Sequence, residues 1–295
     1  MMNQTAETAV GDEIASIGQA GELVLDYVRR GNRTVLAQSR SRSPWHLSPP
    51  IALDETGSAC TFLLNPSGGL VGGDRLRLRA TLGADAHVIL STPSANRVYR
   101  SLAEPSVQSV ELIVGPGAIL EWVPDVTIPF AGSRYHQTVH VSLASGATIL
   151  LWDVIASGRI ARGERWAFAD LANEIQITTA SGGRLLERYR LTPTSKEDSE
   201  DGVGLAGGWD YIASLYVVND TVEVKVWDRM EESLAKVLAD CPNRVSGGVS
   251  QPAVPGLAVK LVARSAPDLD CVWQTLWSAI RGHLWGFPTP ALRRY

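Results

Sequence analysis

The sequence is poor in several features that mark particular classes of protein. Its 295 residues include only three cysteines, Cys60, Cys241 and Cys271, and they form no Cys-x-x-Cys pair. Three widely spaced cysteines argue against a disulfide framework and against a cysteine-rich zinc module. They favour a reducing compartment, so we predict a cytoplasmic protein.

The chain also lacks a basic excess and any long apolar run. It has 27 Lys and Arg against 31 Asp and Glu, which gives a net charge of −4. This balance argues against nucleic acid and anionic membranes as partners. No apolar stretch reaches membrane-spanning length, and the polar residues 1–20 predict a disordered tail rather than a secretory signal.

The motifs of common enzymes are missing as well. The sequence has no Gly-x-Ser-x-Gly elbow and no paired catalytic histidines. Its glycine-rich segment has no Lys-Ser/Thr pair after the last glycine, so it is not a P-loop. The sequence therefore predicts no catalytic residues and no permanently bound cofactor.

That glycine-rich segment is the most distinctive stretch of the chain. Residues 65–75 read Asn-Pro-Ser-Gly-Gly-Leu-Val-Gly-Gly-Asp-Arg and lie between an apolar run and an alternating run, both typical of strands. The glycines permit backbone conformations closed to other residues, or a close approach of another backbone. Two interpretations remain: a tight structural turn, or a turn that places the Asp74 carboxylate.

A repeating pattern extends from residue 75 to residue 191. An alternating run, a turn of small residues and an apolar run recur in that order, with the turn alanines at 86, 118 and 147. A period near 30 residues built from strands and turns indicates stacked coils. We predict a mainly β fold with a β-helix or solenoid-like layered body; a sandwich of successive hairpins gives similar signals.

The remainder of the chain predicts two helices near the C-terminus, at 228–240 and 266–285. Asp228 and Glu231 have capping-box spacing before the first helix, which follows a predicted strand at Val222–Val226. Residues 192–208 are polar and acidic and predict a mobile loop. We expect residues 21–295 to form a single domain.

Some carboxylates lie in predicted strands at positions where no face of the strand is exposed to solvent. Asp153 lies in a run that is apolar on both faces, Glu121 lies in a similar run, and Glu187 shares a face with leucines. A buried charge is costly unless it is paired or binds a metal. One interpretation is local pairing with arginines, for which the candidates are Arg159, Arg162 and Arg188. The other is a polar path lined by carboxylates that transiently hold a divalent ion.

The second predicted helix carries an apolar stripe that includes Trp273 and Trp277. Such a stripe is typical of a helix docked on its own domain, but Trp and Arg are also favoured interface anchors. The candidate partner-binding residues of this helix and the tail after it are Trp273, Trp277, Arg281, Trp285, Arg293 and Arg294.

Four ordered stretches resemble the urease accessory protein family UreD, also called UreH. They are Asn-Pro-Ser-Gly-Gly-Leu-Val-Gly-Gly-Asp (65–74), Ser-Thr-Pro-Ser-Ala-Asn-Arg-Val-Tyr-Arg-Ser (91–101), Leu-Glu-Trp-Val-Pro-Asp-Val-Thr-Ile-Pro-Phe (120–130), and Trp152-Asp153 with Gly158-Arg159 and Gly163-Glu164. The chain departs from the family pattern at Ser67, at Arg97 and at residues 43–46, where an expected Gln-Arg pair is missing.

The resemblance implies a non-catalytic chaperone or scaffold for urease maturation. Such a protein binds apo-urease, a UreF-like protein and, through it, a UreG-like GTPase, and the assembly delivers nickel. By resemblance, Asp74, Asp153 and Glu187 line a nickel path, and the C-terminal helix and tail contact the UreF-like partner. An alternative from another class is a β-helical carbohydrate-active hydrolase, which would need two carboxylates at a defined separation in an open cleft.

Overall fold

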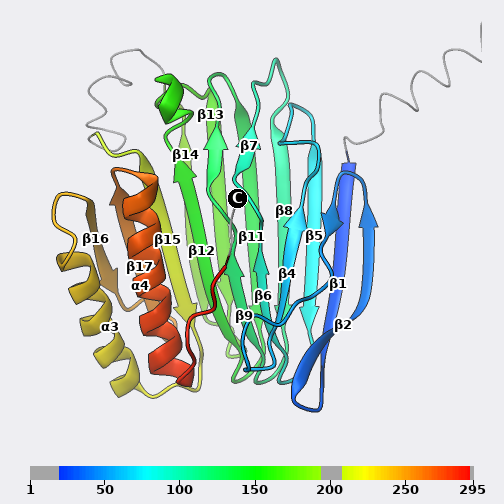
Figure 1. Ribbon diagram of the computed structural model, residues 1–295, viewed down its shortest axis with the longest axis vertical. Coiled ribbons are helices and arrows are strands. Elements are labelled where there is room, and N and C mark those ends of the chain that lie inside the picture. Colours follow the sequence, from blue (N-terminus) through cyan, green and yellow to red (C-terminus); the bar gives the residue numbers. More distant parts are fainter. Residues whose placement is uncertain (1–19, 194–207, 293–295) are drawn as a thin grey trace, which may run out of the picture.

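Short strands separated by tight turns build two β-sheets that face each other (Figure 1). The structure is a computed structural model, and it describes residues 20–193 and 208–292. One sheet has seven strands in the order β14-β13-β11-β8-β5-β1-β2. Its strands are β1 (Ala20–Arg30), β2 (Arg33–Arg42), β5 (Arg75–Leu82), β8 (Ser106–Val114), β11 (Arg134–Leu143), β13 (Asp170–Thr178) and β14 (Arg184–Leu191).

The other sheet has ten strands, eight of them in the order β16-β17-β15-β12-β9-β6-β4-β3. The strands β7 and β10 lie off this path, where β10 pairs with both β7 and β12. The strands of this sheet are β3 (His46–Leu47), β4 (Ala59–Leu64), β6 (His87–Ser91), β7 (Asn96–Val98), β9 (Ile119–Val123), β10 (Thr127–Pro129), β12 (Thr148–Ala156), β15 (Tyr211–Val218), β16 (Val245–Ser250) and β17 (Gly256–Ala263).

From β4 to β13 the chain passes back and forth between the two sheets and advances one strand position with each coil. The pairs β5–β8, β8–β11 and β11–β13 are parallel in one sheet, and β4–β6, β6–β9 and β9–β12 are parallel in the other. Parallel pairing of strands that are separated by a complete coil is the arrangement of a solenoid. The predicted solenoid-like β body is therefore confirmed.

The two ends of the coils differ. At the lower edge in Figure 1 the turns are short and stack on one another, with Ile119 N donating to Ala86 O and Thr148 N donating to Ala118 O, both at 2.8 Å. Gly115 is required for this stacking, because a Cβ there would lie 2.5 Å from Leu82 O. At the upper edge the connections are longer, and the chain segments that match the family motifs begin or end there.

The protein has two hydrophobic cores, one between the two sheets and one between the ten-stranded sheet and the helices. Alternate residues of β5, such as Leu76 and Leu78, fill the space between the sheets, while Arg75 and Arg77 face outward. All nine residues of β12 are buried, because one face meets the seven-stranded sheet and the other meets the helices.

The helices α3 (Val224–Ala239) and α4 (Ala266–Trp285) cover the outer face of the ten-stranded sheet (Figure 1). Helix α4 has the range that the sequence predicts, and Ser265 caps it by accepting a hydrogen bond from Asp268 N. Stacking of Trp273 on Trp152, with ring centroids 4.6 Å apart, fixes α4 on β12. Among the described helices, none is long and apolar enough to cross a membrane.

Helix α3 begins four residues before the predicted start, and its N-cap is Glu223 rather than Asp228. The predicted strand at Val222–Val226 is therefore wrong, because the alternation of valines with charged residues there belongs to the start of a helix. Val224 is exposed, so no sheet buries that side of the alternation. The glycine-containing residues Val245–Ser250 form the edge strand β16.

Three predictions fall wholly or mostly on residues outside the described part of the chain. They are the tail at 1–20, the acidic loop at 192–208, and the contacts of Arg293 and Arg294.

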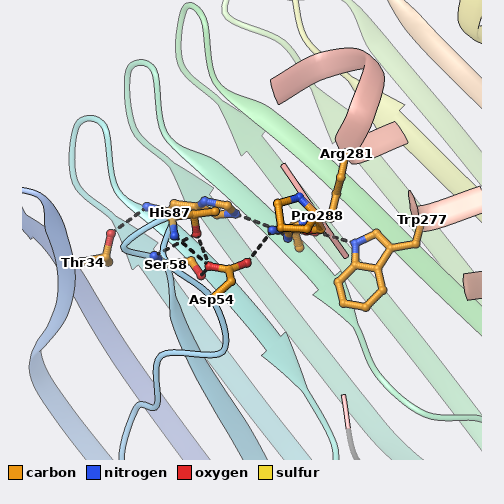
Figure 2. Close-up of polar contacts among 9 residues, drawn as sticks. Thr34, Asp54, Ser58, His87, Trp277, Arg281 and Pro288 are labelled. Atoms are coloured by element: carbon orange, nitrogen blue, oxygen red, sulfur yellow. Dashed lines mark hydrogen bonds and ion pairs between the residues drawn. The ribbon is translucent and has the colours of Figure 1, made fainter. Parts of the chain in front are cut away.

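A buried polar network fixes α4 to the β body (Figure 2). The Arg281 side chain is 0% exposed; it donates to the Glu121 carboxylate, to Asp54 Oδ2 at 2.7 Å and to Pro288 O at 2.8 Å. Glu121, which is also fully buried, accepts a further hydrogen bond from Trp277 Nε1 and contacts His87 Nε2 at 2.7 Å. A carboxylate with partners on β6 and α4 is compensated for its loss of water.

We expect Glu121→Gln to destabilise the protein by about 3 kcal/mol, because it leaves the buried Arg281 charge without its main partner. The matched control is Glu111→Gln, since Glu111 pairs with Arg79 at 3.6 Å while both side chains are half-exposed. That control should change stability by less than about 1 kcal/mol. Urea unfolding of the three proteins measures the difference, and equal effects of the two substitutions would contradict a stabilising role for the network.

Candidate functional site

Asp153 lies between the two sheets and is hydrogen-bonded across the gap. It shares its strand face with Leu151 and Ile155, both in the core between the sheets. Its carboxylate accepts from Gln137 Nε2 at 2.9 Å and from Asn173 Nδ2 at 2.7 Å. Because Gln137 is on β11 and Asn173 is on β13, the opposite sheet supplies both donors. The strand-face argument that placed Asp153 in the interior is confirmed by its 7% exposure.

Glu187 lies on β14 and also faces inward. It forms an ion pair with Lys260 of β17, and Ser214 of β15 donates to its Oε1 at 3.3 Å. Lys260 Nζ also donates to Ser214 Oγ at 2.9 Å. The partner of this glutamate is not one of the predicted arginines but a lysine that is 73 positions away along the chain.

The two carboxylates influence each other electrostatically. Burial raises the pKa of Asp153, and the hydrogen bonds from Gln137 and Asn173 offset only part of that shift. Burial and then the charge of Asp153 raise the pKa of Glu187 to about 7. Burial lowers the pKa of Lys260 to about 8. The pKa values of Glu187 and Lys260 are therefore both shifted towards neutral pH, and shifts of this kind are common at functional sites.

Two cavities flank this cluster. The first, of about 260 Å³, runs from the glycine-rich segment at Gly68 and Gly69 to Gln137 and Asp153. The second, of about 290 Å³, is lined by Glu187, Tyr189, Ser214 and Lys260, among others. Asn173 contacts the walls of both, because its Nδ2 donates both to Asp153 and, at 3.0 Å, to the Tyr189 hydroxyl. Asn173 therefore bridges a residue that lines the first cavity and one that lines the second.

Asp74 has a different environment. It is buried at the start of β5 and its Oδ2 accepts from Val71 N at 2.9 Å, while burial raises its pKa. It lines neither cavity. The structure thus brings together two of the three predicted carboxylates, Asp153 and Glu187. The third, Asp74, lies apart from them and accepts a hydrogen bond within the glycine-rich turn.

Among the described residues, no group of three or more His, Cys, Asp and Glu side chains could hold a metal ion. The cluster offers two carboxylates and the Tyr189 hydroxyl, while Gln137 and Asn173 present N–H groups to Asp153. Oxygen ligands suit hard cations best, and nickel prefers imidazole. The arrangement therefore suits a weakly bound, passing divalent ion better than a stored one.

Sequence reasoning missed Gln137, Asn173 and Lys260. Lys260 interrupts the apolar run of β17, but its side chain is 49% exposed, so the burial argument that located Asp153 does not single it out. The two amides are not singled out either, since a polar residue on one face of an alternating strand is ordinarily taken as exposed.

The candidate partner-binding residues of α4 are mostly internal. Trp273, Trp277 and Arg281 are buried against the ten-stranded sheet or in the Glu121 network. These three side chains are therefore unavailable to a partner in this structure. Trp285 is half-buried and packs near His87, with ring centroids 5.8 Å apart.

Comparison with known sequences identifies the family of the chain. The family described as "UreD urease accessory protein" matches residues 19–295. The chain belongs to the UreD family. The match covers nearly the whole chain, so the family resemblance carried by the four sequence stretches is confirmed.

Individual UreD proteins are similar over most of their length. The urease accessory protein UreD 2 of Streptomyces griseus is 32% identical over 290 residues, covering 90% of this chain and 98% of that protein. The UreD of Deinococcus radiodurans is 32% identical over 278 residues, 94% of this chain and 95% of that protein. The UreD of Sorangium cellulosum is 35% identical over 250 residues, 83% of this chain and 78% of that protein. Family membership supports a role in urease maturation and fits a non-catalytic protein.

The raised pKa of Glu187 predicts a pH-dependent stability. The protonated carboxyl is favoured in the folded state, so its contribution is fully present below about pH 4.5 and is lost as the pH rises through about 7. Glu187→Gln cannot ionise. We therefore expect the stability of this variant relative to the wild type to increase by on the order of 1–3 kcal/mol between about pH 5 and about pH 8.

Urea unfolding at several pH values measures this difference, with Glu111→Gln as the exposed control whose curve should run parallel to that of the wild type. A Glu187→Gln curve that is also parallel would mean that Glu187 keeps its ordinary pKa.

Proposed function

We propose that this UreD-family chain is a non-catalytic, cytoplasmic scaffold for urease maturation. It binds apo-urease and a complex of a UreF-like protein with a UreG-like GTPase, and it gives nickel a path to the urease active site. The observation that carries this proposal is the pair Asp153 and Glu187, whose charges influence each other and of which one lines each of two cavities.

The chemistry of Asp153 and Glu187 supports passage of a nickel ion rather than its tight binding. Two carboxylates in a desolvated space attract a divalent cation, because it compensates charges that water no longer solvates. The Tyr189 hydroxyl oxygen lies close by, while Gln137 and Asn173 present N–H groups to Asp153 and would have to turn their amides to add neutral oxygen ligands. With carboxylate oxygens and no imidazole in the hydrogen-bonded cluster, the affinity for nickel stays low enough for release.

The hydrolase alternative gains no support from this site. A glycosidase needs two carboxylates on opposite sides of an open cleft. Asp153 is instead buried and hydrogen-bonded to two amides, and Glu187 is paired with a lysine.

The C-terminal segment remains the proposed contact with the UreF-like partner. With Trp273, Trp277 and Arg281 buried, this proposal now rests on the half-buried Trp285 and on the tail residues Arg293 and Arg294.

The double variant Asp153→Asn/Glu187→Gln should lower urease activation several-fold in cells that co-express urease and its accessory proteins, because it removes both interior charges. Glu174→Gln is the matched control, since Glu174 lies on the neighbouring strand β13 and forms surface ion contacts with His140 and Arg188. Urease activity is measured together with co-purification of the partners. Full activation by the double variant would exclude the two carboxylates from the nickel path.

Lys260 occupies the position that a cation would take beside Glu187. We therefore expect Lys260→Met to strengthen binding of Ni²⁺ to the purified protein several-fold, because it leaves the Glu187 charge uncompensated. Lys260→Arg keeps a cation and should bind Ni²⁺ as the wild type does. Calorimetric titration with Ni²⁺ measures the three affinities, and equal affinities would show that Lys260 does not compete with the ion.

A further inference from the structure

Two connections at the upper edge of the body form one rigid unit, here called the lip (residues 66–75 and 97–105). Leu70 N donates to Arg97 O at 2.7 Å, and Tyr99 N donates to Leu70 O at 2.8 Å. A Cβ at Gly69 would lie 2.5 Å from Arg97 O, and one at Gly72 would lie 2.9 Å from Glu104 O. The glycines of the family signature therefore allow the two backbones to pack closely together.

The lip exposes apolar side chains. The described residues include five exposed large hydrophobic side chains, and two of them, Val71 at 50% and Leu102 at 92%, lie on the lip. The other three, Ile51, Leu186 and Val224, belong to different segments of the chain. Apolar side chains held outward on a rigid backbone are a feature of protein interfaces, because little conformational entropy is lost when a partner covers them.

The charges of the lip are also unbalanced. Arg75, Arg97 and Arg100 are exposed, and none of them forms an ion pair within the described part of the chain. Glu104 is the one exposed carboxylate of the lip. Some outward-facing arginines of the seven-stranded sheet do have partners, as Arg188 has Glu174. Arg33 and Arg77 are exposed and have no ion pair within the described residues, but they lie outside the lip, whereas three such arginines gather on it. Unpaired arginines on a protein of net charge −4 favour a partner with an acidic surface.

The lip borders the cavity that contains Asp153. Pro66, Gly68, Gly69 and Arg97 belong to the lip and also line that cavity. A protein seated on the lip therefore lies beside one end of the proposed nickel path. Such a position suits the protein that receives the ion.

We propose that the lip is the docking surface for apo-urease, which presents acidic groups to Arg75 and Arg100 and a hydrophobic pocket to Leu102. This inference rests on the proposed function, because it assigns one of the proposed partners to a surface. Arginine and large apolar side chains commonly supply most of the binding energy of an interface.

The test uses the tagged full-length chain co-expressed separately with apo-urease and with the UreF-like protein. The lip variant is Arg100→Glu/Leu102→Ser. The matched control is Arg33→Glu/Val224→Ser, which also reverses one exposed, unpaired arginine and removes one exposed apolar side chain, but away from the lip. Because all four side chains are exposed, both variants should unfold at the same temperature as the wild type.

We expect the lip variant to capture at least ~10-fold less apo-urease, and the control to capture as much as the wild type. Capture of the UreF-like protein should be unchanged in both. Wild-type capture of apo-urease should weaken between about 0.1 M and about 0.5 M NaCl, because salt screens the arginine contacts.

Two results would overturn the assignment. The first is normal capture of apo-urease by the lip variant, and the second is loss of the UreF-like protein instead of apo-urease. Failure of the proposed function gives a different outcome, in which the wild-type chain captures neither protein.

Discussion

One buried carboxylate, Glu121, determines how the C-terminal third of the chain sits on the rest. Its contacts with His87, Trp277 and Arg281 join a strand of the solenoid to a helix some 160 positions later. Because an unpaired charge in that position would be strongly unfavourable, α4 can dock in only one register. Docked there, α4 buries the outer face of β12, and the strand that carries Asp153 is then enclosed on both sides.

The stacked coils divide the molecule into a regular end and a variable end. Short turns at one end repeat the same backbone hydrogen bonds from coil to coil, so an insertion there would disturb its neighbours. The longer connections at the other end carry the glycine-rich segment and much of the lining of the first cavity. A rigid scaffold with function concentrated on its loops is a common arrangement, and here the scaffold also encloses the polar cluster.

Much of this organisation could be predicted from the sequence, because it depends on local periodicity. The spacing of Ala86, Ala118 and Ala147 predicted the coils. The position of Asp153 in a strand that is apolar on both faces predicted its burial. Features that depend on distant partners could not be predicted in this way. The pairing of Glu187 with Lys260 requires β14 and β17 to lie opposite each other, which no local pattern records. The predicted start of α3 was wrong for a related reason, since alternating valines indicate a strand only where a neighbouring strand is available for pairing.

The pairing at the ends of the stack has a consequence for the behaviour of the protein in solution. Each parallel run ends in an antiparallel strand: β2 on β1, β14 on β13, β3 on β4 and β15 on β12. A coil of a second molecule would need a parallel edge in order to continue the stack, and these strands remove it. The exposed edge strand β2 also carries Arg40 and Arg42, and charged side chains disfavour pairing with another edge. The number of coils is thus limited by the chain itself, which protects a protein made of stackable units from growing into fibres.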